Sequence, residues 1–277
     1  MNKVFVFGSN GMLGKYVYTY LKESLTDYKV SPITRVEMDI TKLSYEDLRR
    51  KFLFLGLSKN DVIVNCAGMI KQRNDSPDTD FIMVNSLFPH YLAQLCKLHE
   101  AYFIHISTDC VYDGLTGSYD EKSKHNADDL YGKSKSLGEP VEASVIRTSI
   151  IGEELHNKRS LLEWVKSNKG KSVFGFTNHK WNGVTCLQLS KIIKQIIYDN
   201  LYWCGVRHIY SPRTVNKSEL VNMISDVYKL KITVNPKETT DNCYRDLTSV
   251  YDEVSYFKIP DLLEQLKELK DYNVLDR

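Results

Sequence analysis

The stretch that decides the fold of this chain is Val4-Phe5-Val6-Phe7-Gly8-Ser9-Asn10-Gly11-Met12-Leu13-Gly14. Its first four residues are an apolar run typical of a buried strand, and Met12–Leu25 has the apolar spacing of a helix. Gly8 and Gly11 between them, together with Gly14 in the first turn of the helix, permit a tight turn and a close approach of the backbone to a ligand. The helix N-terminus offers unpaired N–H groups and a partial positive charge, which suit a pyrophosphate. This setting predicts a dinucleotide-binding loop, with a glycine-rich turn that holds no ligand as the alternative.

The rest of the chain extends this strand-loop-helix unit into an α/β fold. Up to residue 150, short apolar runs alternate with longer helical patterns, which favours a parallel sheet covered on both faces. The predicted strands are Lys3–Phe7, Lys29–Thr34, Asp61–Asn65, Tyr102–Ser107 and Ser144–Arg147, and the predicted helices are Met12–Leu25, Tyr45–Phe54, Asp80–His99 and Leu130–Glu139. Pro89 should kink the third of these helices. We therefore predict a Rossmann-like doubly wound parallel sheet in residues 1–150 and a smaller mixed α/β C-terminal lobe in residues 151–277, with segments that can interleave.

The bulk composition excludes several classes of protein. Of 277 residues, 42% are hydrophobic and 26% are charged, which is ordinary for a globular protein with a large core. The formal charge is +2, and the chain has no long run of charged residues of one sign. The sequence therefore predicts no strongly basic surface that would attract nucleic acid or an anionic membrane. No basic and apolar leader and no apolar run of membrane-spanning length occurs, so a cytoplasmic location is expected. The six cysteines lack a C-x-x-C pair and a histidine at zinc spacing, which predicts reduced thiols and no metal site.

A second group of residues is equipped to move a proton. Tyr131 and Lys135 are four residues apart and share one helix face, and Thr108 follows an apolar strand upstream of them. A phenol with a pKa of about 10 is a poor acid at neutral pH, and a neighbouring ammonium is expected to lower that pKa. The Thr108 hydroxyl would donate a hydrogen bond to the same carbonyl oxygen. Thr108, Tyr131 and Lys135 are therefore the predicted catalytic residues of a nicotinamide-dependent carbonyl reductase, with an exposed Tyr-Lys helix pair as the alternative.

These motifs resemble those of the extended short-chain dehydrogenase/reductases, in the branch that contains dTDP-4-dehydrorhamnose reductase. The resemblance covers nearly the whole chain and rests on Gly8-x-x-Gly11-x-Leu13-Gly14, Asn65-Cys66-Ala67-Gly68, Val84-Asn85, Ser107–Gly114, Tyr131-Gly132-Lys133-Ser134-Lys135 and Arg147-Thr148-Ser149. It implies NAD(P)H-dependent reduction of the 4-keto group of a nucleotide-linked 4-keto-6-deoxyhexose. It also implies that the second lobe grips the nucleotide of the substrate.

The expected cofactor residues come partly from the loop and partly from the resemblance. The loop gives Gly8, Asn10, Gly11, Met12, Leu13 and Gly14, and the resemblance adds Asp39 and Ile40 at the adenine, Cys66, Ala67, Gly68 and Lys135. Arg35 follows the second predicted strand, where a cation can pair with a 2′-phosphate. We therefore predict NADPH, with NADH as the alternative. If Arg35 is only a solvated strand-end residue, Glu37 or Asp39 would hold the ribose or the adenine.

Two departures from the family pattern concern the sugar. Ile150 stands where the rhamnose reductases usually carry an aromatic residue, and Met69-Ile70-Lys71-Gln72-Arg73 replaces small and acidic residues. Lys71 and Gln72 would suit an acetamido group on the sugar. We therefore expect a UDP- or dTDP-linked sugar of the N-acetyl-L-rhamnosamine or L-rhamnose type, and of the two nucleotides we favour UDP. The other predicted substrate residues are Thr108, Ser149, Ile150, Trp181, Asn182 and Arg245. A buried packing Trp and a surface Arg are the alternatives for Trp181 and Arg245.

Other functions on the same fold stay open. Cys110 lies two residues after Thr108, where related epimerase/reductases carry a cysteine that exchanges protons next to the ketone. A bifunctional 3,5-epimerase/4-reductase is therefore one alternative, and a small hydrophobic cysteine at a strand end is the other. A non-catalytic nucleotide-binding regulatory subunit would lack one of the three catalytic groups, all of which are present. A dehydratase would need a carboxylate pair after Thr108, where Asp109 is followed by Cys110. A homodimer is compatible with these features.

Overall fold

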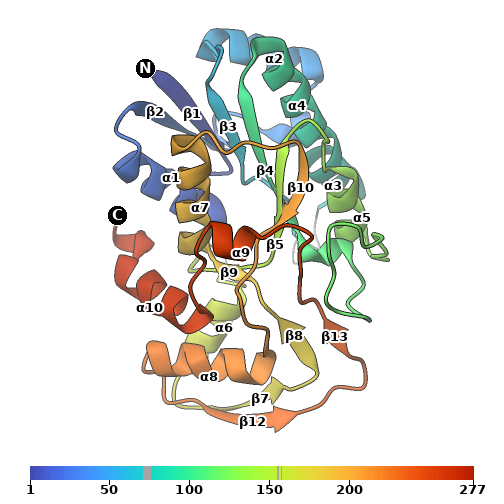
Figure 1. Cartoon of the computed structure of the whole chain (residues 1–277), viewed down its shortest axis with the longest axis vertical. Coiled ribbons are helices and arrows are strands. Elements are labelled where there is room, and N and C mark those ends of the chain that lie inside the picture. The colour runs from blue at the N-terminus through green and yellow to red at the C-terminus, as the bar shows by residue number, and fades with distance from the viewer. Residues whose placement is uncertain (71–75, 155, 157) are drawn as a thin grey trace.

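A parallel sheet of six strands forms the centre of the molecule, in the order β10-β5-β4-β3-β1-β2 (Figure 1). The structure is a computed structural model that describes residues 1–70, 76–154, 156 and 158–277. Each neighbouring pair of strands is parallel. The first five strands are β1 (Asn2–Phe7), β2 (Tyr28–Ile33), β3 (Val62–Asn65), β4 (Tyr102–Thr108) and β5 (Ser144–Thr148). The predicted Rossmann-like doubly wound sheet is confirmed.

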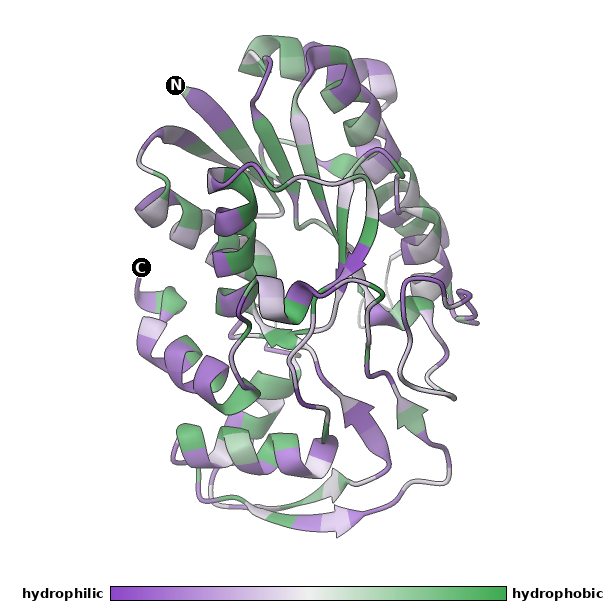
Figure 2. Cartoon of the chain, in the orientation of Figure 1, coloured by the Kyte–Doolittle hydropathy of each residue, from purple (hydrophilic) through white to green (hydrophobic). Residues whose placement is uncertain are grey.

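Helices cover both faces because alternate side chains on a strand point to opposite faces of the sheet. On β1, Val4 and Val6 belong to the core that includes α1 (Met12–Ser24) and α7 (Cys186–Tyr198). Phe5 and Phe7 belong to a second core, with residues of α2 (Tyr45–Leu55) and α4 (Phe88–His99). Figure 2 shows long apolar segments in the central strands, where both faces are covered.

The predicted helix of residues 80–99 consists of three segments. α3 (Asp78–Phe81) is followed by a wider π-helical turn, η2 (Ile82–Leu87), and then by α4, whose first turn contains Pro89. Because proline has no N–H to donate to the carbonyl of Asn85, the disturbance expected at Pro89 falls in the preceding turn. The Asn85 carbonyl faces Gly138 at the end of α5 (Leu130–Leu137), where a Cβ would lie 1.7 Å from the oxygen. The π-helical turn therefore packs directly against α5.

The second half of the chain contributes to the sheet as well as to a separate lobe. β10 (Gly205–His208) pairs with β5, and α7 packs beside α1 (Figure 1). The remaining α-helices and β-strands are β6 (Ile150–Ile151), α6 (Leu161–Ser167), β7 (Ser172–Phe176), β8 (His179–Trp181), β9 (Val184–Thr185), β11 (Val215–Asn216), α8 (Lys217–Val227), β12 (Thr233–Lys237), β13 (Cys243–Tyr244), α9 (Glu253–Tyr256) and α10 (Leu262–Tyr272). The division of the chain near residue 150 stays a prediction, and β10 shows that the segments interleave in the sheet.

Candidate functional site

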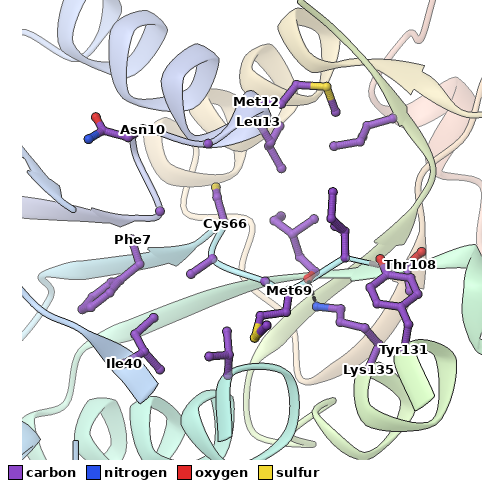
Figure 3. A pocket seen from close by; sticks show the side chains of 18 of the residues that line it. Phe7, Asn10, Met12, Leu13, Ile40, Cys66, Met69, Thr108, Tyr131 and Lys135 are labelled. Carbon is purple, nitrogen blue, oxygen red and sulfur yellow. Dashed lines mark hydrogen bonds between the residues drawn. The ribbon is translucent and has the colours of Figure 1, made fainter. Parts of the chain in front are cut away.

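A cavity of about 740 Å³ lies at the carboxyl ends of the parallel strands (Figure 3). Its lining comes from the glycine loop after β1, from the segments that follow β2, β3 and β4, from α5, and from described residues between 148 and 161. In open α/β sheets, ligands bind outside the carboxyl ends of the strands. The cavity therefore lies where the sequence predicts both the dinucleotide and the proton-transfer group.

The glycine loop forms one wall of the cavity, and close packing requires its glycines. Gly8 has a φ of +71°, and a Cβ there would lie 2.8 Å from the backbone of Ala67. A Cβ at Gly14 would lie 2.1 Å from the carbonyl oxygen of Gly8. Gly11 occupies the N-cap position of α1 and gives it no side-chain cap, so the helix N-terminus is free to meet an anion. Gly8, Asn10, Gly11, Met12 and Leu13 line the cavity, whereas Gly14 is outside the lining and packs beneath the turn.

The end of β2 brings a cation and a carboxylate to the same cavity. Arg35 and Asp39 both line it, with Nε of Arg35 3.5 Å from Oδ1 of Asp39. The Arg35 side chain is 64% exposed, so this weak ion pair leaves the guanidinium available to another anion. Asp39 also accepts hydrogen bonds from the backbone and hydroxyl of Thr41, in η1 (Ile40–Lys42). Arg35, Asp39 and Ile40 thus lie together on the cavity wall, as the sequence predicts.

The turn after β3 also lines the cavity and is held by a buried asparagine. Cys66, Ala67 and Gly68 all contribute to the lining. Asn85 accepts a hydrogen bond of 2.8 Å from the N–H of Met69 and donates one of 3.1 Å to its carbonyl. The same amide donates to the hydroxyl of Ser134 in α5 at 3.0 Å. Asn85 therefore ties the predicted cofactor wall to the helix that carries the catalytic side chains.

Thr108 and α5 meet at the other end of the cavity. The Thr108 hydroxyl accepts a hydrogen bond from the N–H of Cys110 (3.1 Å) and donates to Oδ1 of Asp109 (3.2 Å). Gly132 lets α5 approach this turn, because a Cβ there would lie 2.3 Å from the Cys110 carbonyl oxygen. Tyr131 and Lys135 both line the cavity beside Thr108 (Figure 3). The structure therefore brings the three predicted catalytic residues together.

The charges around Tyr131 differ from the expected ones. Burial raises the pKa of Tyr131, the nearby Cys110 and Asp109 raise it further, and a hydrogen bond with Thr108 opposes them. The Lys135 ammonium is buried and donates its hydrogen bond to the carbonyl of Ile106 at 2.8 Å. The net shift of the Tyr131 pKa is therefore upward in the chain on its own, where a lowering was expected. Burial dominates, and the charges that the phenol faces favour its neutral form.

The pKa of Lys135 is itself strongly shifted. Burial lowers it to about 8, while the nearby Glu139 and Cys66 act in the opposite direction. A lysine with this pKa is charged at neutral pH and loses its proton within a mildly alkaline range. The charge state of Lys135 therefore depends on its buried neighbours.

The predicted substrate residues divide into three groups. Ser149 and Ile150 line the cavity. Trp181 is buried and donates a hydrogen bond of 2.8 Å from its indole to the Ser149 hydroxyl, so it supports the lining from behind. Asn182 is buried and brackets the backbone of Leu247 with two hydrogen bonds of 2.8 Å, which is a structural role outside the cavity. Lys71 and Gln72 lie outside the described residues.

Arg245, a predicted substrate residue, is not part of the cavity lining. Its guanidinium interacts electrostatically with Asp109 and Cys110, and its Nη2 donates a weak hydrogen bond to the carbonyl of Asp113 at 3.4 Å. Its buried Nη1 has no hydrogen-bond partner in the described part of the chain. Lys217 interacts with the same Asp109 and lies 5.3 Å from the Trp181 ring centre. Two cations therefore stand behind the turn that follows Thr108.

Sequence reasoning missed several residues that build this site. Asn85 belongs to the motif Val84-Asn85, but its two hydrogen bonds to the backbone of Met69 could be predicted only if the π-helical turn were known. Glu139 follows Lys135 by four residues, and this spacing predicts that the two side chains are neighbours on a helix. Lys217 had no signal, because only the fold brings α8 beside Asp109. The lining also includes Glu154, His156, Arg159, Ser160 and Leu161.

His105 lies two residues before Ser107 on β4 and is fully buried. Its Nδ1 pairs with the Asn65 amide at 3.1 Å, and burial lowers its pKa well below the usual value. The residues that the structure describes contain no group of three or more His, Cys, Asp or Glu side chains suited to hold a metal ion. Among those residues, no helix combines the length and the apolar character needed to cross a membrane.

Comparisons with known proteins agree with this geometry. Residues 1–243 match the family model described as the RmlD substrate binding domain. The spore coat polysaccharide biosynthesis protein SpsK of Bacillus subtilis is 31% identical over 157 residues, which are 54% of this chain and 53% of that protein. A dTDP-4-dehydrorhamnose reductase of Mycolicibacterium smegmatis is 30% identical over 161 residues, 53% of this chain and 45% of that protein. The match thus spans about half the length of these two curated relatives.

A solved structure extends the likeness to the whole fold. The dTDP-4-dehydrorhamnose reductase of Bacillus anthracis, solved in complex with NADP, superposes with a TM-score of 0.81. The comparison covers 99% of this chain and 100% of that one, at 19% identity. The chain therefore belongs to the RmlD substrate binding domain family, in the dTDP-4-dehydrorhamnose reductase branch of the extended short-chain dehydrogenase/reductases.

Proposed function

We propose that this chain is an NADPH-dependent reductase of the 4-keto group of a nucleotide-linked 4-keto-6-deoxyhexose. The observation that carries the proposal is that Thr108, Tyr131 and Lys135 line one end of a cavity whose other end is an uncapped glycine loop. Reduction of a ketone needs a hydride donor and a proton donor within one site. The relative named as a dTDP-4-dehydrorhamnose reductase and the neighbour solved with NADP support both halves of the assignment.

The residues present fit NADPH. The close approaches at Gly8 and Gly14 leave room only for glycine, and the bare N-terminus of α1 offers N–H groups to a pyrophosphate. Arg35 would pair with the 2′-phosphate, and Lys135 would hold the ribose next to the nicotinamide. When bound, NADPH supplies the hydride for the carbonyl carbon.

The side chains of the site would manage the proton. Tyr131, whose pKa is raised by burial, keeps its proton until the ketone oxygen becomes basic. Thr108 would then donate a hydrogen bond to the same oxygen, and the Lys135 charge would stabilise the phenolate that remains. Tyr131 would therefore be neutral before the reaction, while Lys135 next to it would carry the positive charge.

The sugar and nucleotide side of the proposal rests on the second lobe. Ser149 and Ile150 line the cavity beyond Thr108, where the ketone-bearing ring would lie. Arg245 and Lys217 stand beyond Asp109 and are suited to the charges of a nucleotide diphosphate. UDP and dTDP share this diphosphate. The preference for a UDP-linked acetamido sugar depends on Lys71 and Gln72 and stays a prediction.

A panel of UDP-, dTDP- and GDP-linked 4-keto-6-deoxy sugars tests the proposal. Loss of absorbance at ~340 nm with NADPH, followed by NMR of the product, identifies the nucleotide, the sugar and the configuration at C4. We expect turnover with a UDP- or dTDP-linked substrate. NADPH that stays reduced with every member of the panel would refute the assignment.

A second candidate function, an added epimerisation, is favoured by the surroundings of Cys110. Arg245 and Lys217 both interact electrostatically with this thiol, and neighbouring cations favour a thiolate that can take a proton from the carbon next to a ketone. Incubation of the 4-keto sugar in deuterated water tests it, because an epimerase exchanges hydrogen at C3 or C5. A protein that reduces the sugar without deuterium uptake is a reductase alone.

Three other expectations stay predictions. A regulatory subunit without catalysis would bind the nucleotide and leave the whole sugar panel unchanged. The homodimer can be examined by sedimentation of the purified chain. The cytoplasmic location can be examined by cell fractionation.

A further inference from the structure

Behind the proposed catalytic residues lies a buried ion pair between Glu139 and Arg147. Both side chains are almost completely enclosed, with exposures of 4% and 1%. The Glu139 Oε2 accepts a hydrogen bond of 2.6 Å from Nη2 of Arg147, and its Oε1 accepts one of 3.1 Å from Nε. Oε1 also accepts a hydrogen bond from the hydroxyl of Ser107. One carboxylate therefore connects three elements, namely β4, β5 and the chain just after α5.

The positions of these partners relate the ion pair to the catalytic residues. Ser107 immediately precedes Thr108 on β4, and it is the register partner of Arg147 on β5. Glu139 follows Lys135 by four residues, two positions beyond the end of α5. The clamp therefore fixes the strand that carries the hydroxyl relative to the helix that carries the phenol and the ammonium.

The Arg147 guanidinium is itself held by a shell of neutral acceptors. Nη1 donates to the hydroxyl of Tyr112 at 2.6 Å and to Nε2 of His208 at 2.8 Å. His208 points its Nδ1 at the carbonyl of Thr248 (2.7 Å), so this nitrogen carries the hydrogen and Nε2 is left to accept. Burial lowers the pKa of His208 to about 4, which keeps the ring neutral. Nη2 also meets Nε2 of His125 at 2.7 Å. These contacts leave Arg147 no freedom to move away from Glu139.

The charge of Glu139 also acts on Lys135. Burial lowers the pKa of that ammonium, and Glu139 is the larger of the two influences that raise it, the other being Cys66. The titratable and charged groups that face Lys135 or Glu139 are Cys66, His105, Tyr112, His125, Arg147 and His208. Glu139 is the carboxylate that acts on Lys135, so its removal would leave the buried ammonium with the Cys66 thiol and the His105 ring as its titratable neighbours among the described residues.

We propose that Glu139 is a positioning residue that clamps the Thr108 end of β4, through Ser107 and Arg147, to the chain just after α5, and that it is the buried carboxylate that acts on the Lys135 ammonium. The inference builds on the proposed reductase function, because Lys135 matters there as a cation. Arg147 serves the clamp by holding the carboxylate in place, and it is not part of the cavity lining itself.

Glu139→Gln tests the charge, because the amide keeps the size of the side chain and loses the charge. We expect the pKa of Lys135 to fall by about one unit or more, since a buried neighbouring charge shifts a pKa by that amount. The readout is the 13Cε shift of Lys135, followed by NMR through a pH titration of lysine-labelled protein, which needs neither cofactor nor turnover. In the reductase assay, the alkaline limb of kcat/KM should move to lower pH by the same amount. An unchanged Lys135 titration overturns the proposal.

A further variant separates the charge from general damage to the fold. Glu139→Asp keeps the charge and should restore the titration of Lys135 to near the native value. If Glu139→Asp does not fold, Glu139→Gln still tests the proposal by itself. A folded Glu139→Asp that titrates like Glu139→Gln contradicts the proposal.

Glu253→Gln is the matched control. Glu253 is an equally buried carboxylate, 4% exposed, that pairs with Arg207 at 2.8 Å, and it is not part of the cavity lining. Its loss should leave the Lys135 titration and the pH profile as in the native protein. If the native chain reduces no sugar, the proposed function fails while the NMR titration still decides the inference. If it reduces the sugar and Glu139→Gln titrates like the native chain, only the inference fails.

Discussion

The ammonium of Lys135 donates a hydrogen bond of 2.8 Å to the carbonyl oxygen of Ile106, two residues before Thr108 on β4. This contact anchors α5 on the strand that ends in the catalytic hydroxyl. It also keeps a positive charge buried under the cavity, where burial lowers its pKa to about 8. The site therefore has a neutral phenol in its lining and a cation held beneath it.

Replacing Tyr131 by Phe should abolish reduction and leave NADPH binding nearly intact. The variant loses the hydroxyl that would protonate the ketone, and general acid catalysis is typically worth about 10²- to 10⁴-fold in rate. Turnover and fluorescence titration of NADPH measure the two effects separately. Tyr198→Phe, at the exposed end of α7, is the control. A Tyr131→Phe variant that keeps most of its turnover shows that another group is the acid.

Replacing Arg35 by Ala should weaken NADPH and leave NADH almost unaffected. A hydrogen bond between charged groups contributes about 1.5 to 3 kcal/mol, so the Kd of NADPH should rise roughly 10- to 100-fold. Arg49→Ala removes an exposed arginine that pairs with Glu46 on α2 and serves as the control. Equal losses for the two cofactors mean that Arg35 does not meet the 2′-phosphate.

Replacing Gly132 by Ala should displace α5 from the turn after β4. The new Cβ would lie 2.3 Å from the carbonyl oxygen of Cys110, which no side-chain rotation relieves. Overpacking of this kind costs about 1 to 3 kcal/mol, and kcat should fall because Tyr131 moves with the helix. Urea unfolding and kinetics measure both. Lys133→Ala, exposed on the same helix, should change neither, and native stability and kcat in Gly132→Ala would show that α5 can shift without consequence.

The pH dependence of stability should reveal the buried Lys135. Its pKa is about 8 in the folded chain and 10.5 as the ordinary value, so between these pH values the unfolded chain binds the extra proton. The free energy of unfolding, taken relative to Lys135→Met, should therefore rise as pH increases from about 8 to 10.5, by about 3 kcal/mol in total. Below pH 8 the burial of the charged Lys135 lowers the free energy of unfolding by a constant amount. A difference between the two proteins that is flat across this range would mean that the ammonium is not desolvated.

Much of the fold could be predicted from local pattern. β1, the glycine loop and α1 follow from an apolar run, three glycines and a helical spacing, all within one short segment. The sixth strand was the harder case, because Gly205–His208 is short and only half apolar, and it joins the sheet through its pairing with β5. The Asp80–His99 pattern predicted a single helix, whereas the missing N–H of Pro89 and the packing of Gly138 against Asn85 accompany a π-helical turn.

The sequence by itself determined which chemical groups this protein has and where along the chain they are, because turn glycines, strand ends and residues four apart on a helix are local properties. The tertiary structure decided what those groups experience. Tyr131 is kept neutral by burial and by Cys110 and Asp109, and Lys135 is turned to Ile106 and faces Glu139. Asn182, which the sequence suggested for the substrate, instead brackets Leu247. Desolvation and charge act through space, so they depend on neighbours that only folding brings together.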